Sequence, residues 1–177
     1  KAGRGGDVGG LLGPLELDAA TFERDLIVGG AMRRQNAARI VKIDAIRRHL
    51  AEREPGLRAL VERTVAAVTP APKYAVPDIE NLGPVPTTTP ELDAYEARLA
   101  SVGKAMDVVE ESYSAALESV EALRSELAGI EAKGLDATGA SLLAAARGVL
   151  GQTPVQLDAA RSLVAGCRAY ASTSGGR

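Results

Sequence analysis

Residues 92–130 carry apolar or aromatic side chains at every third and fourth position in alternation, without a break. This alternation averages about 3.5 residues per turn, which is typical of helices that pack against one another as coiled coils. Exposing so many apolar side chains to water is unfavourable, so we expect other helices to cover them. We call these twelve positions the seam: Leu92, Tyr95, Leu99, Val102, Met106, Val109, Tyr113, Ala116, Val120, Leu123, Leu127 and Ile130.

The sequence also marks where this helix begins and ends. Thr89 and Pro90 precede the acidic Glu91, which is typical of a helix start because acidic side chains stabilise the positive N-terminal end. Lys133 followed by Gly134 is typical of a helix end. We therefore predict a helix of about 44 residues, or about 65 Å.

The rest of the chain also favours helices. Apolar residues make up 46% of the sequence but aromatic residues only 3%, and a core of small aliphatic side chains suits close helix packing. A short helix is predicted after Asp18, and Gly29–Gly30 and Pro55–Gly56 are expected to interrupt the helices around them. The other predicted helices span 31–54, 55–68, 139–151 and 154–172. The predicted fold is all-α: a long coiled-coil-like helix with shorter antiparallel helices packed on it as a bundle.

Glycine and proline divide the chain into parts. The first thirteen residues contain six glycines, and residues 70–90 contain six of the nine prolines. Glycine-rich segments are flexible and proline-rich segments are extended. The predicted parts are a flexible Gly-rich tether (1–13), an N-terminal helical segment (14–69), an extended Pro-rich linker (70–90), a helical hairpin or bundle with the long helix (91–172) and a flexible tail (173–177). Because the chain begins at Lys1 and not at Met, we expect it to be either a processed chain or part of a larger protein.

Two arrangements can cover the seam. The other predicted helices are long enough in total to cover it within one chain, and we favour this arrangement. Alternatively, a second copy of the chain covers it, and the seam is then a dimer interface. The oligomeric state separates the two.

The residues of common catalytic and metal sites are scarce. His49 is the only histidine and Cys167 the only cysteine, too few for a structural zinc site, and no Glu-x-x-His motif of a di-iron bundle is present. The Gly-Lys at 103–104 lacks the other residues of a phosphate-binding loop. We therefore expect no enzymatic activity, no cofactor and no metal. A single cysteine and the lack of a long apolar run predict a cytoplasmic chain without a membrane span.

One predicted helix is rich in basic residues, and this suggests an alternative function. Residues 31–54 contain seven basic side chains, while the chain as a whole has a net charge of −2. The leading prediction is a non-enzymatic protein–protein interaction or scaffold module, with nucleic-acid binding through this basic helix as an alternative. A ligand-binding sensor domain of a membrane receptor is a third hypothesis. The predicted contact residues are Tyr74, Ile79 and Leu82 in the linker and Arg34, Arg47 and Arg48 on the basic helix.

Overall fold

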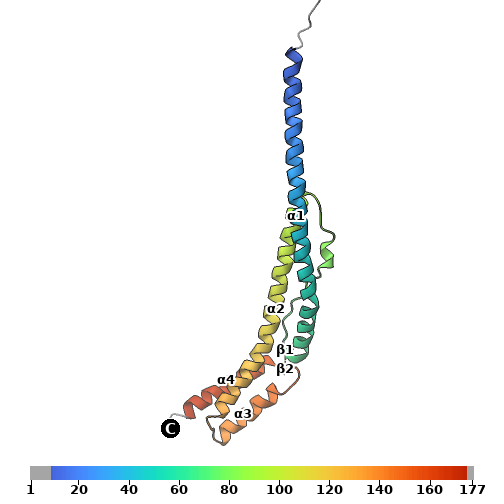
Figure 1. Ribbon diagram of the computed structural model, residues 1–177. Coiled ribbons are helices and arrows are strands. Elements are labelled where there is room, and N and C mark those ends of the chain that lie inside the picture. The colour runs from blue at the N-terminus through green and yellow to red at the C-terminus, as the bar shows by residue number, and fades with distance from the viewer. Residues whose placement is uncertain (1–8, 175–177) are drawn as a thin grey trace, which may run out of the picture.

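The computed structural model describes the backbone of residues 9–174 and the side chains of residues 17–173. In this part of the chain, four α-helices pack together, and two short parallel strands form the only sheet (Figure 1). The prediction of an all-α fold is confirmed in these terms. The elements are α1 (Gly9–Ala67), β1 (Val68–Thr69), the 3-10 helix η1 (Glu80–Leu82), α2 (Thr89–Glu131), α3 (Ala137–Leu150), β2 (Val155–Gln156) and α4 (Leu157–Ser174).

The first helix is continuous, and the predicted breaks within it are wrong. α1 runs for 59 residues through both Gly29–Gly30 and Pro55–Gly56, and Asp18 lies inside it. Each glycine in a helix costs only about 1 kcal/mol relative to alanine, which good helix formers on either side offset. Pro55 is exposed, so water can reach the backbone groups that a proline leaves unpaired. Residues 9–13 of the predicted tether belong to α1, while 1–8 and 175–177 lie outside the described residues.

α1 and α2 run in the same direction, side by side (Figure 1). Asn36 donates a hydrogen bond to the Thr89 hydroxyl at 3.1 Å, and further along both helices Arg53 pairs with Asp107 at 2.9 Å and Glu110 at 2.8 Å. Contacts that advance together along both helices mean a parallel pair. The prediction of shorter antiparallel helices is therefore wrong for α1, which is longer than α2 and parallel to it.

Parallel helices need a connection that returns along their length, and residues 70–88 provide it (Figure 1). This connecting segment packs onto the helix pair through Ile79, which is 2% exposed. Two seam tyrosines hold its backbone. The Tyr113 hydroxyl lies 2.8 Å from the carbonyl oxygen of Pro72 and 2.9 Å from that of Tyr74. The Tyr95 hydroxyl donates to the carbonyl oxygen of Gly83 at 3.1 Å.

The seam of α2 is covered within the chain. Nine of its twelve side chains are buried, and Val102, Ala116 and Leu123 are partly buried. The first half of the seam packs with α1 and the connecting segment in one core cluster, and the second half packs with α3 and α4 in another. One chain therefore supplies the partners of the seam, without a second copy.

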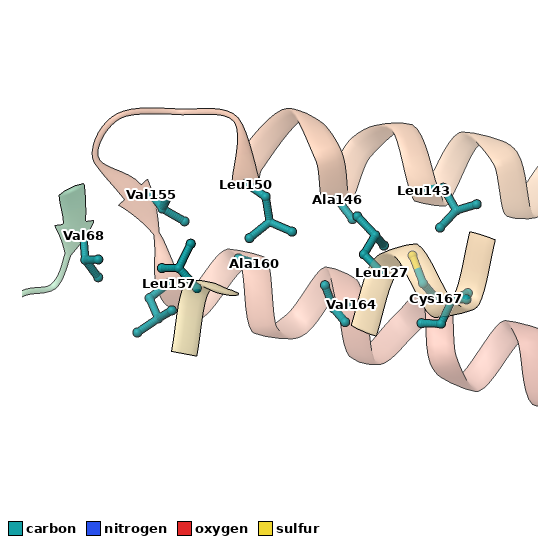
Figure 2. Packing of buried hydrophobic residues seen from close by; sticks show 12 residues of the cluster. Val68, Leu127, Leu143, Ala146, Leu150, Val155, Leu157, Ala160, Val164 and Cys167 are labelled. Carbon is teal, nitrogen blue, oxygen red and sulfur yellow. The ribbon is translucent and has the colours of Figure 1, made fainter. Parts of the chain in front are cut away.

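The second cluster closes the end of the molecule at which α2, α3 and α4 meet. Figure 2 shows Leu143, Ala146 and Leu150 of α3 facing Ala160 and Val164 of α4. The two short strands extend this cluster towards the end of α1, because Val68 pairs with Val155 in the parallel register. All of these side chains except Leu143 are at most 5% exposed, and Leu143 is 6% exposed.

Asp136 caps α3, and we predict that its contribution to stability depends on pH. Its carboxylate accepts hydrogen bonds from the Gly139 N–H at 2.9 Å and from the Tyr170 hydroxyl at 2.6 Å, which lower the pKa of Asp136. A lowered pKa stabilises the folded chain above the unfolded-state pKa, about 3.9, and this contribution disappears as the pH falls through the folded-state pKa.

We therefore expect Asp136→Ala to lower the melting temperature at pH 7 and to have a smaller effect at about pH 3. Thermal unfolding followed by circular dichroism at both pH values measures the difference. An equal loss at both pH values would contradict the assignment of a charged cap.

Candidate interaction surface

The paired part of α1 has a seam of its own. Between Asn36 and Val68, the residues at three-four spacing are all buried or partly buried, and most of the others are exposed. Six of these ten positions are apolar, such as Ile43 and Leu50, but Arg47 and Glu54 also occupy them. The polar residues hide the alternation from a search for apolar residues.

The same spacing continues along α1 beyond the point where α2 begins. Counting back from Asn36, the positions fall on Arg33, Gly29, Leu26 and Phe22. α2 begins at Thr89, which bonds to Asn36, and every residue from 17 to 28 is exposed. We call residues 17–35 the arm. Figure 1 shows this part of α1 standing alone, so its seam positions have no partner helix among the described residues.

Large apolar side chains gather on the arm. Six of them are at least half exposed, although residues of this kind in the paired part of α1 are mostly covered. The six are Leu17, Phe22, Leu26, Ile27, Val28 and Met32. Phe22 and Leu26 lie on the seam line and Met32 lies beside it, while Leu17, Ile27 and Val28 lie on other sides of the helix. Exposed apolar surface of this extent is typical of a helix that contacts a partner.

The three contact residues predicted in the linker differ in exposure. Tyr74 is exposed, but Leu82 is partly buried and Ile79 is buried in the core with α1 and α2. A buried side chain offers no surface to a partner, which argues against Ile79 as a contact residue. Its apolar character reflects core packing, which the proline content around it obscured.

Ion pairs to α2 account for part of the predicted basic surface. Arg39 pairs with Glu96 at 2.8 Å and Asp93 at 2.6 Å, and these hydrogen bonds raise the pKa of Arg39. Arg53 pairs with α2 in the same way. Arg34 and Arg48 are exposed and hydrogen-bond to carbonyl oxygens of their own helix, while Arg47 is partly buried on the α1 seam. Arg47 and Arg48 line one hollow with Asp44 and Ala51, a set that includes neither Arg34 nor a residue of the linker.

The structure places the only cysteine and the only histidine of the sequence apart from each other. Cys167 is buried, and burial raises the pKa of its thiol, which disfavours the reactive thiolate. His49 is exposed on α1, away from the cluster that holds Cys167. Between residues 17 and 173, no group of three or more potential metal-ligating side chains occurs. No helix in the part that the structure describes is long and apolar enough to cross a membrane.

A hollow of about 490 Å³ lies where the strands meet α2. Apolar side chains such as Val68, Leu117 and Val155 line it together with Glu118 and Arg124. Among the described side chains, every buried nitrogen or oxygen atom has a hydrogen-bond partner. The arm is the part of the described surface where exposed apolar side chains most clearly lack a partner to pack against.

Comparisons with known proteins add no relative to this picture: no family model, no curated protein and no solved structure matches the chain.

Proposed function

We propose that this chain is a non-enzymatic helical module that binds another protein through the arm of α1. The observation that carries the proposal is the exposure of six large apolar side chains on the arm, two of which, Phe22 and Leu26, lie on the line of the α1 seam past the start of α2. A helix that lays its apolar face against a partner is a common mode of protein recognition.

The pairing of α1 with α2 supports this function because it anchors the helix from which the arm extends. Ile43 and Leu50 anchor α1 in the core, and the ion pairs of Arg39 and Arg53 fix it against α2. The arm is the direct continuation of this anchored helix. Part of its helical structure is therefore present before a partner arrives, which lowers the entropy lost on binding.

Burial of the apolar side chains of the arm would contribute substantially to the free energy of binding a partner. Covering a large apolar side chain contributes about 1.5–3 kcal/mol relative to leaving it exposed. Phe22 and Leu26, which lie on the seam line, are 67% and 52% exposed. Covering these two side chains and their apolar neighbours offsets a substantial part of the entropic cost of association.

Site-specific crosslinking in the cells that produce the protein tests this function. A photo-crosslinking phenylalanine analogue is placed at position 22 or, as a control, at Val108, which is exposed on α2 outside the seam. We expect one discrete protein adduct from position 22 that Leu26→Glu abolishes, and none from position 108. The same adducts from both positions, or no adduct from position 22, would refute the proposal.

A further inference from the structure

The charges beside the seam indicate what kind of helix fits the arm. In the pair of α1 and α2, the residue before a seam position of α1 faces the residue after a seam position of α2. Arg39 precedes Ile40 and pairs with Glu96, which follows Tyr95. Arg53 and Glu110 repeat this arrangement two heptads later, with the pairing atoms 2.8 Å apart. These flanking positions are the ones that select partners in coiled coils.

On the arm the flanking charges have the opposite sign. Asp18 and Asp25 occupy the positions equivalent to Arg39 and Arg53, and Glu23 lies at the other flank, directly after Phe22. All three acidic side chains are exposed, and within the described residues none of them forms an ion pair. The remaining flanking positions of the arm, Gly30 and Met32, are uncharged.

We propose that the arm takes a partner helix whose apolar seam is flanked by lysine or arginine, supplied by another protein. This inference rests on the proposed function and adds the chemistry of the partner. Continuity with the pair of α1 and α2 places the partner against Phe22 and Leu26, and the three carboxylates then face basic side chains.

A second copy of the chain fits the arm less well. Two parallel arms would place Asp18 of one copy against Glu23 of the other. Two antiparallel arms would place aspartates against aspartates and glutamates against glutamates. Like charges at flanking positions are destabilising, so these carboxylates disfavour the pairing of two arms and favour a basic partner helix.

Titration of the full chain with two designed helical peptides tests this inference. Both peptides carry leucine at the seam positions of about four heptads; one has lysine at every flanking position and the other has glutamate. Isothermal titration calorimetry at low salt measures the two affinities. We expect the lysine peptide to bind about ten-fold tighter or better. The matched charge variant is Asp18→Lys, Glu23→Lys and Asp25→Lys combined, which we expect to prefer the glutamate peptide.

Further outcomes separate this inference from the proposed function. Leu26→Glu is expected to abolish binding of the lysine peptide, because the seam as well as the charge is needed. Equal affinities, no binding of either peptide, or an unchanged preference in the charge variant would overturn the inference. So would a stable dimer of the wild-type chain, twice 18.3 kDa by light scattering, that Leu26→Glu dissolves. The crosslinking experiment at position 22 judges the proposed function independently of all these results.

Discussion

Replacing Leu99 with alanine is expected to lower the free energy of unfolding by about 3 kcal/mol. Leu99 is 2% exposed and belongs to the core cluster that α2 forms with α1 and the connecting segment. Truncating a leucine in such a place removes buried apolar surface and leaves a cavity that the rigid helix pair cannot fully close. Urea or guanidinium denaturation followed by circular dichroism measures the loss.

The control for Leu99→Ala is Val108→Ala on the same helix. Val108 lies off the seam and is 44% exposed, so its truncation is expected to cost less than about 1 kcal/mol. Similar losses for the two variants would mean that the seam is not buried in solution. A loss at Leu99 alone supports the covering of α2 by α1.

The long helix α2 could be predicted from the sequence because its apolar alternation is complete and both of its ends are marked. The helix begins at Thr89 and ends at Glu131, within a few residues of the prediction, and Gly134 takes the left-handed conformation (φ 67°) in the turn that follows. Glycine adopts this conformation without the steric cost that a side chain brings. Local signals sufficed here because each of them agrees with the packing.

The extent of α1 could not be predicted from local signals. Gly29–Gly30 and Pro55–Gly56 are unfavourable in a helix, but the packed residues on both sides of Pro55, such as Leu50 and Leu57, stabilise α1 across it. The seam of α1 also carries Asn36 and Thr64, which donate hydrogen bonds to the Thr89 hydroxyl and to the carbonyl oxygen of Tyr113 on α2. Their role depends on partners that only the folded chain reveals.

The direction of α1 relative to α2 could not be predicted from the sequence either. A helix pair is usually antiparallel when its connection is short, and the apolar pattern is the same for either direction. Residues 70–88 reach at most about 68 Å when extended, and the paired part of α1 is about 50 Å long, so the connection is long enough for a parallel pair. Length permits the return path, while Ile79 and the tyrosine hydroxyls hold the segment along it.

The arm shows why exposure is the hardest property to predict from sequence. Phe22 and Ile43 lie on the same line of α1, yet Phe22 is 67% exposed and Ile43 is 1% exposed. The difference arises because α2 begins opposite Asn36, which is set by residues far along the chain. A pattern of apolar residues therefore predicts a packing face without saying whether the chain itself covers it.

Replacing Ile79 with alanine is expected to cost about 2–4 kcal/mol, as much as a truncation inside a helix pair. Ile79 is the most buried side chain of the connecting segment, at 2% exposed, and it packs in one cluster with residues of α1 and α2. Its backbone N–H also bonds to the Glu54 carboxylate at 3.4 Å, which ties the segment to α1. If residues 70–88 were a free linker, this truncation would have almost no effect.

The control is Tyr74→Ala in the same segment, where the side chain is 52% exposed and the carbonyl oxygen that faces Tyr113 is retained. We expect it to cost less than about 1 kcal/mol. Chemical denaturation measures the loss in free energy of unfolding for both variants. Amide hydrogen exchange shows which part of the chain is destabilised. Faster exchange of the connecting segment in Ile79→Ala, with β2 and α4 unchanged, would show that the segment is held by the pair of α1 and α2. Equal costs for the two variants would mean that residues 70–88 lie loosely on the helices, and the parallel pair would then depend on its seams and ion pairs alone.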